Sequence, residues 1–89
     1  MERWERMKEV FELLDNGNSL TVRELSDTLD IDLQLADNLL RHYNKNGYLT
    51  RYKDVSNDNK YTYQLSEKGC KQLKDFLENN EYLDYLEIY

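Results

Sequence analysis

The sequence predicts a small α+β fold that is mainly helical, with a three-helix core, a β-hairpin and a C-terminal helix. Three observations support this prediction. Apolar residues recur at three- and four-residue steps in residues 2–14, 22–29, 33–45 and 67–79. Alternating segments rich in Tyr and Thr occupy residues 48–55 and 60–65. The chain has 89 residues, which is enough for one compact hydrophobic core.

The first predicted helix covers residues 2–14 and is amphipathic. Its apolar stripe consists of Trp4, Met7, Val10, Phe11 and Leu14. The segment Asp15-Asn16-Gly17-Asn18 is expected to end this helix, because Gly17 readily adopts the left-handed conformation found after helix C-termini.

Residues 19–49 predict two helices joined by a tight turn. Residues 19–21 can pair at the edge of a small sheet, and Thr21 is the expected N-cap, with Glu24 completing a capping box. Asp32 is the expected N-cap of the second helix, which covers residues 33–45 and ends near Gly47. The residues of that helix expected to face the core are Leu35 or Ala36, Leu39, Leu40 and Tyr43.

Two strands, residues 48–55 and 60–65, form the predicted hairpin, with turn residues at 56–59. Its tyrosines are expected to pack the sheet against the helices (Tyr48, Tyr52, Tyr61 and Tyr63). Ser66 is expected to cap a last helix that ends near Asn79-Asn80, with an inner stripe of Cys70, Leu73, Phe76 and Leu77. This break divides the chain into a folded domain, residues 1–80, and an apolar C-terminal segment, residues 81–89.

Charge is unevenly distributed along the chain. Lys and Arg number 12 against 18 Asp and Glu, a net charge of −6, which is unusual for a protein that binds nucleic acid. Residues 41–60 carry five basic and two acidic side chains and form the positive segment. An acidic molecule with one basic edge can still be oriented by the field of a duplex.

Several classes of protein are disfavoured by the residues present. Cys70 is the single cysteine, so an internal disulfide is excluded, and no stretch resembles a signal peptide or a membrane span of about 20 apolar residues. We therefore expect a cytoplasmic protein without membrane association. His42 has no partner ligands, no nucleophile–base pair is evident, and the three glycines are dispersed, so we expect no metal, no cofactor and no enzyme activity. We favour a surface or packing role for His42 over a phosphate contact, and a buried apolar role for Cys70 over redox sensing.

Three stretches, LTVRELSDTLDID, LLRHYNKNGYLTRY and YTYQLSEKG, resemble small winged helix-turn-helix transcriptional regulators of the MarR- and PadR-like type. The third contains a Leu-Ser-x-x-Gly junction at Leu65, Ser66 and Gly69. This resemblance covers roughly residues 20–77. It implies a winged helix-turn-helix fold and sequence-specific binding of double-stranded DNA by a regulator, a repressor rather than an activator. The recognition helix would be residues 33–45 in the major groove, with the wing, residues 48–65, on the flanking backbone. The acidic total charge and Asp37 depart from the pattern.

The residues expected to contact DNA lie on the outward side of the helix at residues 33–45 and on the hairpin. They are Leu33, Gln34, Asp37, Asn38, Arg41, Lys45, Arg51, Lys53, Asn57 and Lys60. Amide side chains can bridge adenine N6 and N7, arginine can pair with guanine or a phosphate, and Asp37 can accept from cytosine N4 or repel the backbone. The alternative is that these residues form an ordinary solvated surface.

Six of the last nine residues are apolar or aromatic, which is unusual in a chain whose mean hydropathy is −0.95. This segment is expected either to fold back on its own domain or, as we favour, to form a homodimer with the first helix of a second chain. The residues predicted to mediate dimerisation are Trp4, Phe11, Tyr82, Leu83, Tyr85, Leu86 and Tyr89. The alternative function is a winged-helix protein-interaction module that does not bind DNA.

Overall fold

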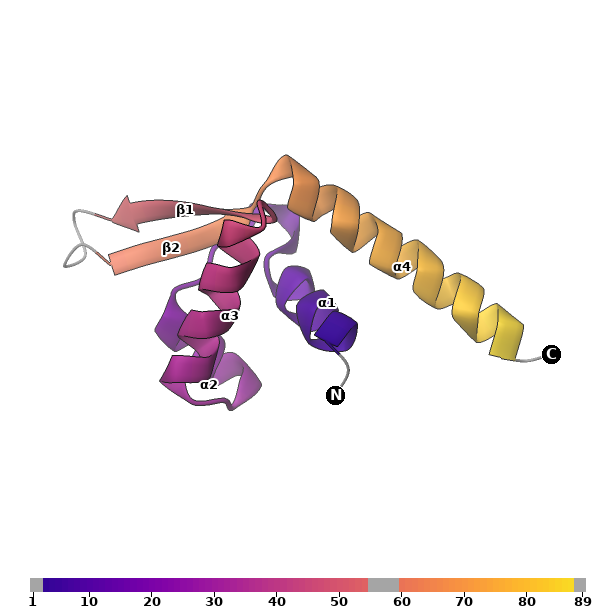
Figure 1. The fold of residues 1–89 in the computed structure, drawn as a ribbon, viewed down its shortest axis with the longest axis horizontal. Coiled ribbons are helices and arrows are strands. Elements are labelled where there is room, and N and C mark those ends of the chain that lie inside the picture. The colour runs from indigo at the N-terminus through magenta and orange to yellow at the C-terminus, as the bar shows by residue number, and fades with distance from the viewer. Residues whose placement is uncertain (1–2, 55–59, 88–89) are drawn as a thin grey trace.

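The computed structural model describes the backbone of residues 3–54 and 60–87, and the side chains of residues 4–53 and 60–78. Along the chain the elements are α1 (Arg3–Leu13), a 3-10 turn (Asp15–Gly17), α2 (Val22–Leu29), α3 (Leu33–Lys45), β1 (Leu49–Asp54), β2 (Lys60–Leu65) and α4 (Glu67–Glu87). Helices α1, α2 and α3 form the body, and the hairpin and α4 extend from it in opposite directions (Figure 1). The predicted mainly helical α+β architecture is therefore confirmed.

The helix boundaries follow the capping residues. Thr21 and Glu24 form the predicted capping box: the Glu24 backbone N–H donates to Thr21 Oγ1 at 3.1 Å, and the Thr21 N–H donates to Glu24 Oε1 at 3.0 Å. Asp32 caps α3 by accepting from the Leu35 N–H at 2.7 Å. Between these helices Asp30 adopts the left-handed conformation, at φ 53°, which turns the chain sharply enough for α3 to begin three residues later.

The hairpin is antiparallel and pairs Leu49 with Leu65 at its base and Asp54 with Lys60 at its outer end. The segment before α2 joins it as predicted: Leu20 and Tyr63 exchange two backbone hydrogen bonds, at 3.0 and 2.8 Å. The predicted turn at residues 56–59 lies outside the described residues.

A single core cluster holds these elements together. Its buried members come from all three helices of the body, from both strands and from α4: Val10, Phe11, Leu14, Leu25, Ala36, Leu40, Tyr43, Leu49, Tyr63 and Leu73. Phe11 lies at the centre, because its ring is 5.4 Å from that of Tyr43, 5.7 Å from Tyr48 and 6.3 Å from Phe76.

Helix α4 differs from the sequence prediction in two ways. The expected break at Asn79-Asn80 is wrong, since α4 continues without interruption to Glu87. The expected inner stripe is also partly wrong. Gly69, Leu73 and the half-buried Phe76 face the body, whereas Cys70 and Leu77 are exposed. Cys70 is therefore not a buried apolar residue.

The phase of α4 is set by a close contact at Gly69. A Cβ at this position would collide with the carbonyl oxygen of Tyr48 and lie 2.9 Å from Leu65 Cδ2. Because the backbone of α4 meets the chain leading into β1 at this residue, its neighbour Cys70 turns outward. The glycine of the Leu-Ser-x-x-Gly junction is thus required sterically, which the periodicity of apolar residues alone does not reveal.

Two of the four hairpin tyrosines do not pack as expected. Tyr63 is buried and Tyr48 is half-buried, as predicted, but Tyr52 and Tyr61 are exposed. Both lie in the outer half of the hairpin, beyond the reach of the helices. Their exposure corrects the prediction and leaves two aromatic rings on the wing surface.

Candidate nucleic-acid interface

Helix α3 presents a polar face away from the core. Ala36, Leu40 and Tyr43 are buried, which resolves the choice between Leu35 and Ala36 in favour of Ala36, since Leu35 is exposed. The outward face carries all six helix residues of the predicted DNA surface: Leu33, Gln34, Asn38, Arg41 and Lys45 are exposed and Asp37 is partly exposed. Contact between these residues and DNA stays a prediction.

Tyr43 anchors the C-terminal half of α3 in the core. Burial raises the pKa of its hydroxyl above the ordinary value, an effect that the nearby Arg6 guanidinium partly offsets. The phenol therefore remains neutral at physiological pH, as its packing against Phe11 requires. His42, the next residue back, is exposed and lies 3.2 Å from the Asn46 side-chain amide.

The end of α3 is tied to the wing and to α4 by three side-chain hydrogen bonds. Asn44 donates to the carbonyl oxygen of Leu49 at 2.9 Å, which links α3 to β1. Ser66 donates through its hydroxyl to the carbonyl oxygen of Gly47 at 2.6 Å, and the same hydroxyl caps α4 by accepting from the N–H of Gly69 at 3.1 Å. Lys68 Nζ donates to the carbonyl oxygen of Asn46 at 2.7 Å.

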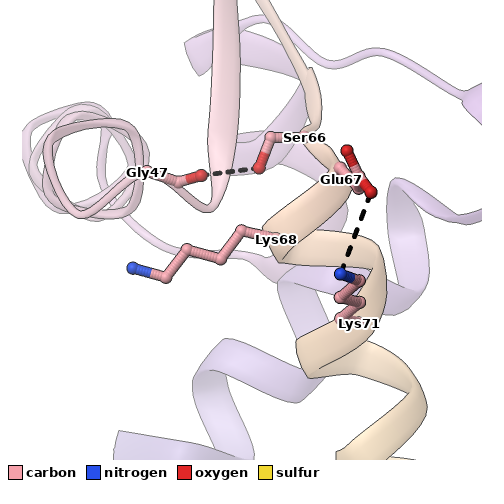
Figure 2. A pocket seen from close by; sticks show the side chains of 5 residues that line it. All are labelled: Gly47, Ser66, Glu67, Lys68 and Lys71. Atoms are coloured by element: carbon pink, nitrogen blue, oxygen red, sulfur yellow. Dashed lines mark hydrogen bonds and ion pairs between the residues drawn. The ribbon is translucent and has the colours of Figure 1, made fainter.

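Figure 2 shows this junction, where an open, shallow hollow is lined by Gly47, Ser66, Glu67, Lys68 and Lys71. Glu67 and Lys71 form an exposed ion pair at 3.8 Å across one turn of α4. The cation of Lys68 also lies 4.6 Å from the centre of the Tyr48 ring. Orphan carbonyl groups at the C-terminus of α3 are thus satisfied from α4, which fixes the position of α3. The role of Lys68 has no local signal in the sequence, because its partner lies 22 residues earlier in the chain.

The wing carries the cations that the sequence analysis assigned to it. Arg51, Lys53 and Lys60 are exposed, and the Arg51 guanidinium lies 4.3 Å from the centre of the exposed Tyr61 ring. This stacking limits the freedom of Arg51 and keeps its charge on the hairpin surface. Asn57, the predicted contact at the tip, lies outside the described residues.

The charge of this surface is mixed. Between Thr21 and Asn46, the helix-turn-helix carries three basic side chains (Arg23, Arg41 and Lys45) and five acidic ones (Glu24, Asp27, Asp30, Asp32 and Asp37). The cations of the wing lie next to this acidic unit, since β1 follows α3 directly. Electrostatic attraction to a duplex would therefore come mainly from the wing and from the C-terminal half of α3.

Large apolar side chains are also exposed on α1 and on α4. Trp4 is 40% exposed and Leu77 is 44% exposed. Phe11 is fully buried within the body, so its prediction as a dimerisation residue is corrected: the ring packs inside one chain and offers no surface to another. The side chains of Tyr82, Leu83, Tyr85, Leu86 and Tyr89 lie outside the described residues.

Neither a membrane helix nor a metal site is found in the part of the chain that the structure describes. No helix there is long and apolar enough to cross a bilayer. Within the same residues, His, Cys, Asp and Glu side chains form no group of three that could hold a metal ion.

Solved structures with the same arrangement include a transcription regulator and a repressor. MepR, described as a transcription regulator of the Staphylococcus aureus multidrug efflux pump MepA, superposes with a TM-score of 0.77 at 18% sequence identity, over 92% of this chain and 61% of MepR. A MepR–DNA complex gives a TM-score of 0.76 at 17% identity, over 98% of this chain and 69% of that chain. The adhesin competence repressor AdcR from Streptococcus pyogenes gives 0.73 at 17% identity, over 98% and 63%. The fold is a winged helix-turn-helix.

The predicted resemblance is thereby confirmed for the fold. No family model matches the sequence, and no curated protein matches it either. The chain spans 61% of the length of MepR, so about two fifths of that protein has no counterpart here.

Proposed function

We propose that this chain binds double-stranded DNA sequence-specifically and regulates transcription, as a repressor rather than an activator. The observation that carries the proposal is the exposed polar face of α3 beside a cationic wing, on a fold shared with a protein solved in complex with DNA. In such a fold the recognition helix enters the major groove and the wing contacts the flanking backbone. The proposal involves no catalytic reaction.

Five exposed residues of α3 then have a chemical role. Gln34 and Asn38 can each bridge N6 and N7 of an adenine, and Leu33 can contact a thymine methyl group. Arg41 can pair with guanine or with a phosphate, and Lys45 lies at the helix end where the backbone would pass. On the wing, phosphate contacts are assigned to Arg51, Lys53 and Lys60, and a minor-groove contact to Asn57.

We further propose that the chain acts as a homodimer. Two recognition helices about 34 Å apart would read a palindromic site on one side of the duplex and would offset the weak attraction of a single acidic chain. The proposed contact surface consists of the exposed Trp4 and Leu77 together with the apolar residues of the 81–89 segment.

A protein-interaction module is the second candidate function. It is favoured by the net charge of −6 and by the acidic excess of the helix-turn-helix itself. Repulsion between these carboxylates and DNA phosphates would leave the same fold free to bind another protein. The two candidates differ in what they predict for duplex binding.

The test is fluorescence anisotropy of a labelled random-sequence duplex, titrated with protein from low to physiological salt. DNA binding predicts an affinity that falls steeply with salt, because bound cations release counterions from the duplex. The triple variant Arg41→Ala, Arg51→Ala, Lys53→Ala should bind more weakly, with a salt slope reduced by about one for each lost phosphate contact.

A matched control removes three cations from elsewhere: Lys8, Lys71 and Lys74, each to Ala. This variant has the same net charge as the first, so a local interface predicts near wild-type binding. Equal loss in both variants would reject our assignment of the surface. No binding to random or genomic duplexes, even at low salt, would favour the protein-interaction module.

A further inference from the structure

Asp37 and Arg41 form an ion pair on the outward side of the recognition helix. Asp37 Oδ2 lies 3.6 Å from Arg41 Nη1, with the two residues one helical turn apart. Their side chains are 40% and 64% exposed. The three other ion pairs among the described residues lie on α1 and α4, away from this surface. A carboxylate thus lies beside the main base-reading cation of α3.

We propose that Asp37 and Arg41 together read one G·C base pair, an inference that rests on the proposed DNA binding. In the major groove this base pair presents guanine N7 and O6 as acceptors, followed by the cytosine N4 amino group as a donor. The Arg41 guanidinium offers two parallel donors, and the Asp37 carboxylate beside it offers an acceptor. The order of donors and acceptors on the protein therefore complements the order on the base pair.

The spacing of the ion pair suits this reading. Guanine O6 and cytosine N4 are joined by a Watson–Crick hydrogen bond, so these atoms are about 2.9 Å apart. The separation of 3.6 Å between Arg41 Nη1 and Asp37 Oδ2 is similar. An adenine–thymine pair presents, in order, the acceptor N7, the donor N6, the acceptor O4 and the thymine methyl group. It therefore offers no two adjacent acceptors to the two parallel donors of an arginine.

The ion pair also leaves both side chains free to contact DNA. Exposed ion pairs at this spacing on a helix are weak, so Asp37 and Arg41 can turn from each other to a base edge at little cost. Asp37 repels phosphates, so it would weaken contact with the backbone alone while rewarding the correct base pair. The negative charge of Asp37 then increases selectivity for one base pair and is compatible with DNA binding.

The experiment selects duplexes from a random library with the wild type, Asp37→Ala and Arg41→Ala, and measures affinities for the selected site and its single-base-pair variants. Alanine is used because asparagine would keep an acceptor oxygen. The wild type should require G·C at one position, by about 5- to 150-fold over A·T. Both variants should lose selectivity at that same position. Asp37→Ala in the Arg41→Ala background should produce no further loss.

Glu12→Gln provides the matched control. Glu12 forms an ion pair with Lys8 at 3.6 Å with the same four-residue spacing on α1, so this change removes one negative charge at a distance from α3. A general gain in DNA affinity from the lost charge should appear in Glu12→Gln as well as Asp37→Ala. The loss of base selectivity should appear in Asp37→Ala and be absent from Glu12→Gln.

Three outcomes would overturn the inference. Asp37→Ala could keep the wild-type base preferences, whether or not it binds more tightly, in which case Asp37 only repels phosphates. The two variants could alter different positions, which would separate their roles. Either result leaves the proposed function intact. A wild type that enriches no sequence refutes both the paired reading and sequence-specific DNA binding.

Discussion

Gly69 is a single residue on which the position of α4 depends. Replacing a glycine in a helix with alanine ordinarily stabilises a protein by about 1 kcal/mol. Here the added Cβ would collide with the Tyr48 backbone oxygen, which cannot move without disturbing the start of β1. We expect Gly69→Ala to lower the free energy of unfolding by about 1–3 kcal/mol, measured by urea denaturation.

Cys70→Ala is the control for this substitution. Cys70 is the adjacent residue of the same helix turn and is exposed, so its replacement should change stability by less than about 0.5 kcal/mol. If Gly69→Ala proved as stable as the wild type, the close approach of α4 to Tyr48 would be incorrect.

At the scale of an element, α2 depends on its capping box. Thr21→Ala removes the Oγ1 acceptor for the Glu24 N–H, although the backbone N–H of residue 21 can still donate to the Glu24 side chain. We expect a loss of about 1 kcal/mol in the free energy of unfolding, as for other N-cap substitutions. Because α2 packs against α3, binding to a selected DNA site should weaken in parallel at temperatures near the unfolding transition.

Thr28→Ala is a matched substitution at the other end of the same helix. Thr28 is exposed and lies within the helix, where alanine is the better helix former, so stability should stay the same or rise slightly. Equal destabilisation by both substitutions would indicate that the capping box contributes nothing specific.

At the scale of the whole molecule, α4 extends beyond the region in which it contacts the body. It has 21 residues, about 31 Å of helix, and leads away from the other elements toward the C-terminus (Figure 1). If the 81–89 segment forms the dimer interface, truncation after Asn80 should convert a dimer into a monomer in sedimentation velocity. Tyr52→Ala, which removes an exposed aromatic ring from the wing, should leave the dimer intact.

Two results would contradict this assignment. A truncated chain that still sediments as a dimer would place the interface elsewhere, for instance at Trp4. A full-length chain that sediments as a monomer at all concentrations would instead favour the alternative in which residues 81–89 pack against their own domain.

Most of the element boundaries follow from local signals in the sequence. Thr21 with Glu24, Asp32 and Ser66 each mark the start of a helix, and Leu33–Lys45 and Lys60–Leu65 match the predicted ranges. These signals can be read locally, because a capping side chain bonds to backbone groups two or three residues away. The amphipathic pattern likewise identified the buried face of α3, apart from the choice between Leu35 and Ala36.

Tertiary structure alone decided which way α4 and the wing tyrosines face. Cys70 and Leu77 fit an apolar stripe by spacing, but the contact of Gly69 with Tyr48 rotates the helix and exposes them. Tyr52 and Tyr61 alternate as strand residues do, yet no helix reaches them. The contact of Lys68 with the end of α3 was equally hidden. Each outcome depends on segments that are distant in sequence, and periodicity within one segment carries no information about where another segment will lie.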